Sequence, residues 1–141
     1  MITNNSTHTV LFLFTANNNL AGTIPQHIGY LPSIVHLDLS FNNIGGSIPQ
    51  GLNAASQMQR LSLNSNQLTG SVPSYVFYSW KELTYFSIER NLLTGDINQL
   101  CTTEEKNTVL RADCLGDNAE IQCACCNFCC SPDEKCENKE G

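Results

Sequence analysis

The chain repeats one asparagine-centred pattern four times, at spacings of 24, 24 and 25 residues. The asparagines are Asn18, Asn42, Asn66 and Asn91. Before each one lies an alternating stretch such as Leu37-x-Leu39, and after it comes a segment such as Ile44-x-Gly46-x-Ile48. One such stretch would be an ordinary loop. Four copies in phase predict a solenoid, in which each coil buries its apolar face only against its neighbours.

Each coil is expected to begin with a short strand. In the second copy Leu37 and Leu39 alternate with polar residues, and a period of two turns the leucines inward and the polar residues outward. The chain must then turn, which leaves backbone N–H and C=O groups in need of partners. An asparagine amide offers both donors and an acceptor, so a column of stacked asparagines is expected to satisfy those groups from coil to coil.

The second half of each coil is expected to bend and return. The recurring glycine permits a tight backbone turn, and the prolines fix φ on the return side, before a loose helical turn. The prolines are Pro25, Pro49 and Pro73. On the helical turn an inward position repeats at Ile28, Leu52, Val76 and Cys101.

The ending Leu20-x-Gly22-x-Ile24-Pro25 resembles the plant-type class of leucine-rich repeats, which is found in receptor-like kinases, receptor-like proteins and polygalacturonase-inhibiting proteins. The resemblance covers about residues 10 to 100. It implies an α/β leucine-rich-repeat solenoid of about four to five coils, with a parallel β-sheet on the concave face. It also implies a binding surface rather than an enzyme. It names no ligand, because the motif residues are the buried ones.

All eight cysteines follow residue 100. They are Cys101, Cys114, Cys123, Cys125, Cys126, Cys129, Cys130 and Cys136. The segment from Ala112-Asp113-Cys114 to Cys129-Cys130 resembles the closing module of leucine-rich-repeat proteins predicted in diatoms and related algae. Such cysteine density favours an oxidising compartment. We expect a disulfide-rich cap whose bridges tie the tail back to Cys101 and Cys114, with a connectivity that the sequence leaves open.

A zinc or redox site is the alternative at this end. Cys126-x-x-Cys129 has the spacing of half a zinc site or of a redox pair. The three histidines, His8, His27 and His36, lie far from it, so a zinc site would use four thiolates. A thiol oxidoreductase would need its pair at the start of a helix beside a βαβ unit, which the pattern does not predict. We therefore expect no metal and no cofactor.

The chain is divided into a polar lead over 1–9, the solenoid over 10–116, and a Cys-rich cap with an acidic tail over 117–141. A formal charge of −6 argues against nucleic-acid binding, and no apolar run approaches the about 20 residues of a membrane span. The lead lacks a signal-peptide pattern and carries weak N-glycosylation sequons at Asn4 and Asn5. The cysteines nevertheless favour an extracellular or cell-surface location, so we expect the C-terminal part of a longer secreted or surface protein.

No catalytic residue is predicted, because no nucleophile motif, phosphate-binding loop or carboxylate pair stands out. Exposed strand positions on the concave face are the candidate ligand contacts, since solenoids commonly bind there. One column is expected to hold Phe12, His36, Arg60, Tyr85 and Arg111, in a register that places Ala112 beside Phe86. The predicted contact residues are His36, Asp38, Phe41, Arg60, Asn64, Tyr85, Glu89 and Arg90.

Two functions fit these observations. The first is a recognition module that binds a protein, a peptide or a cell-wall glycan; aromatic and arginine side chains on an exposed face suit such binding. The second is a structural segment that closes a longer repeat array. Leu13, Leu20, Ile24 and Ile28 would give the first coil an uncovered apolar face, able to stack on upstream repeats or on another chain.

Overall fold

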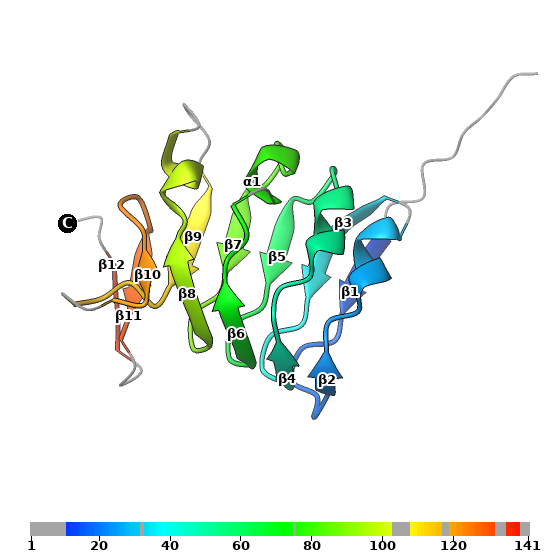
Figure 1. The fold of residues 1–141 in the computed structure, drawn as a ribbon, viewed down its shortest axis with the longest axis horizontal. Helices are drawn as coiled ribbons and strands as arrows, with labels where there is room; N and C mark the ends of the chain where they lie inside the picture. Colours follow the sequence, from blue (N-terminus) through cyan, green and yellow to red (C-terminus); the bar gives the residue numbers. More distant parts are fainter. Residues whose placement is uncertain are drawn as a thin grey trace, which may run out of the picture.

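The computed structural model describes residues 11–31, 33–74, 76–102, 108–116, 119–131 and 135–138. The polar lead and its sequons at Asn4 and Asn5 lie outside these residues. The described chain winds as a solenoid, and each of the first five coils gives one strand to each of two sheets (Figure 1). The predicted leucine-rich-repeat solenoid with a disulfide-rich C-terminal end is confirmed.

Seven strands form the main sheet, in the order β1-β3-β5-β7-β9-β11-β12. Their bounds are β1 (Leu11–Phe14), β3 (Ile34–Asp38), β5 (Arg60–Ser62), β7 (Tyr85–Ser87), β9 (Val109–Ala112), β11 (Phe128–Cys130) and β12 (Cys136–Asn138). Neighbours are parallel as far as β11, because each coil returns to its starting side before the next strand begins. The last strand, β12, is antiparallel to β11, so the sheet is not parallel throughout.

Five short strands form the second sheet, in the order β10-β8-β6-β4-β2. Their bounds are β2 (Ala21–Thr23), β4 (Asn43–Gly46), β6 (Gln67–Ser71), β8 (Leu92–Asp96) and β10 (Ile121–Gln122). Helical turns lead back to the main sheet: η1 (Gln26–Tyr30), η2 (Gln50–Ala54), α1 (Val76–Ser79) and η3 (Asn98–Thr102). Both sheets therefore continue beyond residue 116 into the Cys-rich segment.

The interior between the sheets is a stack of equivalent apolar side chains. One column has a spacing of 24, 25 and 24 residues. Its members are Leu37, Leu61, Phe86 and Leu110, each at most 1% exposed. Each coil thus contributes little core of its own and depends on the coils beside it, as the repeat pattern predicted.

The fifth coil lies two residues away from the predicted register. Leu110 pairs with Phe86, whereas the sequence comparison placed Ala112 there. Arg111 is therefore not in the column of Tyr85, and that part of the prediction is wrong. The reason is packing: Leu110 preserves the 24-residue spacing from Phe86 and fills the core layer, which an alanine side chain would leave partly empty.

The repeated asparagines connect neighbouring coils through hydrogen bonds. Asn42 Nδ2 donates to Thr15 O of the preceding coil at 2.9 Å, and Asn42 Oδ1 accepts from Leu20 N at 3.0 Å. Asn66 and Asn91 make the same pair of contacts with the coils before them. The side chains replace the partners that the turning backbone lacks.

Asp113 takes over this role at the end of the regular array. In the third coil Asn66 N donates to Arg90 O of the next coil, at 3.2 Å. In the fourth coil the Asp113 carboxylate is the acceptor instead, at 3.0 Å from Arg90 N and 3.3 Å from Asn91 N. Burial raises the pKa of Asp113, and the two N–H donors oppose that rise. Asp113 therefore substitutes for the carbonyl groups of a further regular coil.

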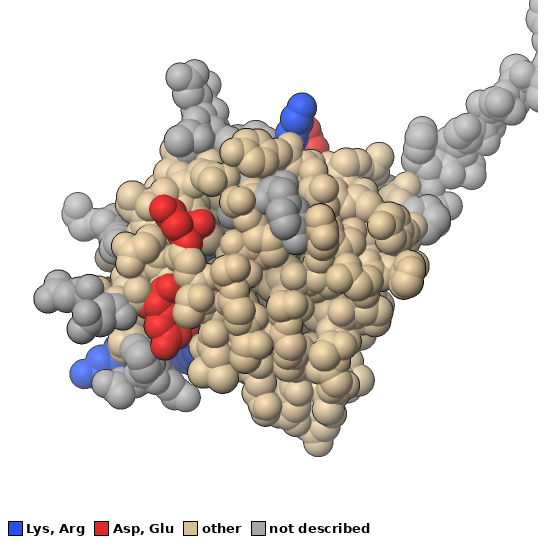
Figure 2. All heavy atoms as spheres, in the orientation of Figure 1, with Lys and Arg blue, Asp and Glu red and all other residues tan. Residues whose placement is uncertain are grey.

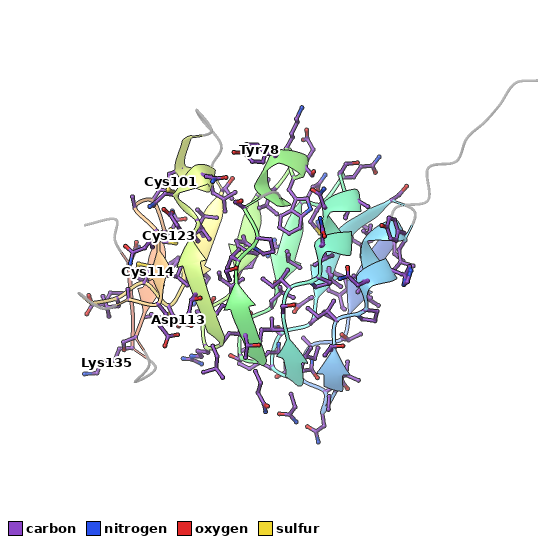
Figure 3. All side chains as sticks on the ribbon, in the orientation of Figure 1. Tyr78, Cys101, Asp113, Cys114, Cys123 and Lys135 are labelled. Atoms are coloured by element: carbon purple, nitrogen blue, oxygen red, sulfur yellow. A yellow bond between two sulfur atoms is a disulfide. The ribbon has the colours of Figure 1, made fainter. Side chains whose placement is uncertain are left out.

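Four disulfides pair all eight cysteines in the C-terminal end, where Figure 3 shows three of them beside Asp113. The pairs are Cys101–Cys125, Cys114–Cys129, Cys123–Cys126 and Cys130–Cys136. The first pair is separated by 24 residues, one repeat length, so it joins equivalent positions of successive coils. Each bridge typically contributes about 2–4 kcal/mol, and this segment has few apolar side chains with which to hold its shape.

The helical turns η1 and η2 approach each other through two glycines. A Cβ on Gly51 would lie 1.6 Å from Gln26 O, and a Cβ on Gly29 would lie 2.0 Å from Gly51 O. Gly51 N also donates to Gln26 Oε1 at 2.9 Å. Only glycine permits this separation of the two backbones.

Candidate ligand-binding face

The outward side of the main sheet, called the main-sheet face here, carries the predicted column of contacts. Phe12 pairs with His36, His36 with Arg60, and Arg60 with Tyr85. The Arg60 guanidinium carbon lies 4.6 Å from the centre of the Tyr85 ring, a cation–π distance that holds both side chains in place.

A hollow of about 330 Å³ lies on this face. It is lined by Asp38, Ser40, Phe41, Arg60, Ser62, Asn64, Tyr85, Glu89, Arg90, Arg111 and Cys136. Seven of the eight predicted contact residues are among them; the exception, His36, packs on Phe12 instead, at 4.7 Å between ring centres. The structure adds Arg111, which the incorrect register had moved away, and Cys136 from the capping hairpin.

Phe41 and Arg90 reach the rim of the hollow from an unusual backbone conformation. Each stands just before a ladder asparagine and has positive φ, 54° for Phe41 and 59° for Arg90. Asn17 and Ser65 hold the equivalent positions with φ of 55° and 57°. L-residues adopt this region only where neighbouring contacts enforce it. The turn that the asparagine ladder stabilises therefore also aims these two side chains.

Glu89 differs from its prediction as an exposed contact. Its side chain is buried, with 4% exposed, and it forms the floor of the hollow. Arg111 Nε lies 2.9 Å from Glu89 Oε1, and Ser87 Oγ donates to Glu89 Oε2 at 2.7 Å. Arg111 also covers the Phe128 ring, at 4.8 Å from its centre. A buried carboxylate requires such partners, so Glu89 positions Arg111.

His36 reports the electrostatics at the edge of this face. Burial lowers the pKa of His36, the positive charge of Arg60 lowers it further, and a hydrogen bond with Gln59 opposes both. Since the folded pKa is below the unfolded one, His36 stabilises the fold less as the pH falls below about 6.5. Near neutral pH the side chain is uncharged and packs as an aromatic ring.

Catalytic and metal sites were also considered. Within the described residues, the groups that line the hollow form no arrangement of nucleophile and base, and His36 lies outside it. The Sγ atoms of Cys101, Cys123 and Cys125 lie within 4.8 Å of one another. Each belongs to a disulfide, whereas zinc binds thiolates, so the zinc alternative would first require reduction.

In the part of the chain that the structure describes, no helix has the length and apolar character needed to cross a lipid bilayer.

Comparison with known proteins points to one repeat class. The family model described as Leucine Rich Repeat matches residues 33–54 and 57–78. No curated protein matches the chain. The matched segments coincide with the second and third coils, whose patterns are the most regular.

Several solved structures share the fold. The BIR3–SERK2 complex from Arabidopsis thaliana is 31% identical, with a TM-score of 0.61, over 79% of this chain and 59% of that chain. The Arabidopsis receptor kinase HAESA, in complex with the peptide hormone IDA and the co-receptor SERK1, is 35% identical, with a TM-score of 0.55, over 58% of this chain and 14% of that chain. A plant ice-binding protein is 28% identical, with a TM-score of 0.58, over 70% of this chain and 30% of that chain.

The chain thus spans between 14% and 59% of the length of these structures. Its asparagine ladder, its two sheets and its L-x-G-x-I-P endings agree with the matched repeats. The chain is a leucine-rich-repeat protein whose repeats are of the plant type.

Proposed function

We propose that this chain is a non-enzymatic recognition module that binds a protein or peptide ligand in the hollow of the main-sheet face. The observation that carries the proposal is the composition of the hollow. Side chains from successive coils converge there, and they combine three arginines, two carboxylates and two aromatic rings. Such a mixture supplies hot-spot contacts and polar specificity together.

Similar structures support a protein or peptide ligand. HAESA is a receptor kinase captured with a peptide hormone and a co-receptor, and BIR3 is captured with SERK2. A cell-wall glycan is the alternative ligand. The four disulfides support an extracellular or cell-surface location, and we place the chain in the C-terminal part of a longer protein of that kind.

The hollow favours an extended ligand with both acidic and apolar groups. Arg60 is stacked on Tyr85, so its guanidinium edge can bind a carboxylate while the ring packs against an apolar side chain. Arg111 is already held by Glu89 and therefore presents a fixed donor. A pre-formed site of this kind loses little conformational freedom when the ligand binds.

Replacing Arg60 or Tyr85 by alanine is expected to weaken ligand binding at least about tenfold, or about 1.4 kcal/mol. A phage-displayed library of linear peptides would be selected on the wild-type protein, and calorimetry with the enriched synthetic peptides would measure affinity.

The matched control is Gln67→Ala, an exposed change on the second sheet, which should leave affinity unchanged. All three variants should melt close to the wild type. Peptides that bind the Arg60 and Tyr85 variants as tightly as the wild type would reject the hollow as the site, and enrichment of glycans but not peptides on an array would favour the alternative ligand.

A second candidate function is end-to-end assembly through the first coil. Phe12, Phe14, Leu20 and Leu31 are between 38% and 65% exposed there, and large exposed apolar groups of this kind mark contact surfaces. Size-exclusion chromatography with light scattering is expected to show self-association that Phe14→Ser weakens. A wild-type monomer at every accessible concentration would contradict stacking of this chain on itself.

A further inference from the structure

The outward side of the second sheet, called the second-sheet face here, carries a repeated set of small polar side chains. Each coil places there one residue from each of three ranks. The amide rank is Asn19, Asn43 and Gln67; the small rank is Ala21, Gly45 and Thr69; the hydroxyl rank is Thr23, Ser47 and Ser71. Eight of these nine residues are exposed, and Gly45 is half-buried.

This face carries no charge across the first three coils. Between residues 11 and 80 the chain has two charged side chains, Asp38 and Arg60, and both line the hollow on the opposite sheet. Figure 2 views the molecule from the second-sheet side, and the surface over β2, β4 and β6 shows neither blue nor red atoms. Acidic groups begin at the C-terminal side of the face, where Asp96 ends β8.

The repeat fixes the hydroxyl rank in position. Each of its side chains lies over the glycine of the following coil: a Cβ on Gly46 would be 2.8 Å from Thr23 Cγ2, and a Cβ on Gly70 would be 3.7 Å from Ser47 Cβ. The glycines have positive φ of 74° and 81°, which keeps each turn the same. Parallel pairing then sets the strands about 4.8 Å apart. The result is a rigid, periodic array of donors and acceptors.

Such an array suits a periodic and uncharged partner. A charged ligand would find no counter-charge on it, and a protein partner would ordinarily bury aromatic anchors, which none of the three ranks supplies. Hydroxyl and amide groups both donate and accept, so they can hold a layer of ordered water molecules. Water held at the repeat spacing of a rigid protein can join a crystal of water molecules.

We propose that the second-sheet face adsorbs to ice. The amide and hydroxyl ranks hold first-layer water in an ordered arrangement, and the absence of charge avoids the strongly bound hydration shells that would interrupt it. The site is separate from the hollow on the main-sheet face, so each activity can fail without the other.

The test measures thermal hysteresis and inhibition of ice recrystallisation with the full chain, its disulfides intact. The wild type is expected to shape ice crystals and to delay their growth. Thr69→Lys and Ser71→Lys each place a strongly hydrated ammonium in the array, and both are expected to lose most of the hysteresis. Ser56→Lys makes the same exchange at an exposed position after η2 and should retain it.

Melting curves would check that all three lysine variants fold. A wild type with no effect on ice growth overturns the proposal, and so does full activity of Ser71→Lys. Retention on crystalline cellulose that Ser71→Lys abolishes, without any effect on ice, would assign the face to a polysaccharide and also overturn it.

Discussion

Replacing Asn42 and Asn66 together by leucine is expected to abolish stable folding. Each amide bonds to the coil before it, and leucine would leave Leu20 N and Ile44 N, among other groups, without partners. An unsatisfied buried group costs about 1–3 kcal/mol, and several are created at once. A domain of this size has only about 5–15 kcal/mol of stability, so the sum approaches the whole.

Thermal and urea unfolding, followed by circular dichroism, would measure this loss. The control is Asn18→Leu: Asn18 is exposed and its Nδ2 donates to Thr15 O and Ala16 O of its own coil, so a far smaller loss is expected. A double variant that melts within a few degrees of the wild type would show that the inter-coil amide bonds do not hold the solenoid together.

Changing Gly51 to alanine is expected to be the most damaging single methyl addition in the chain. The new Cβ would meet Gln26 O at 1.6 Å, far inside van der Waals contact, and backbone cannot move aside as a side chain does. Coils one and two would have to separate at η1 and η2, exposing Leu52, which is 0% exposed in the native fold. Overpacking of this kind costs about 1–3 kcal/mol or more.

Gly45→Ala provides the matched comparison. Its Cβ would lie 3.7 Å from Gln67 O, an ordinary contact, so its midpoint of urea unfolding should stay near that of the wild type while that of Gly51→Ala falls clearly. Equal midpoints for the two variants would mean that η1 and η2 are not packed as closely as described.

The repeated part of the fold could be predicted because its pattern is local and occurs four times. Strand, turn and ladder follow from alternation, glycine and asparagine, and any error in one copy is corrected by the others. The fifth coil lacks this redundancy: Leu115 stands where the ladder asparagine would be, 24 residues after Asn91. Without that marker, the alignment followed Ala112 and Cys114 and moved by two residues.

The capping chemistry could be predicted only in part. A high cysteine content indicated cross-links, but pairing depends on which sulfur atoms the coils bring together, a property of three-dimensional position. One signal was available, since Cys125 follows Cys101 by one repeat length. The role of Asp113 had no comparable signal, because a carboxylate that replaces backbone carbonyls looks like any exposed acid in the sequence.

The candidate site shows the same division. Outward strand positions identified most of the hollow, because alternation determines which side chains leave the core. The burial of Glu89 could not be seen in this way, since it arises from Arg111 and Ser87 on neighbouring coils. Non-local ion pairs of this kind are invisible to a pattern that treats each coil separately.

The Asp113 carboxylate and the antiparallel β12 give the solenoid a direction. One end has its hydrogen-bonding edge occupied, so regular 24-residue units cannot be appended beyond it without removing that acid and the hairpin. Internal units obey no such restriction, because the second and third coils are equal in length and interchangeable in their ladder contacts. Gene duplication or protein engineering can therefore vary the length of the array by inserting or deleting interior coils while its terminus stays unchanged.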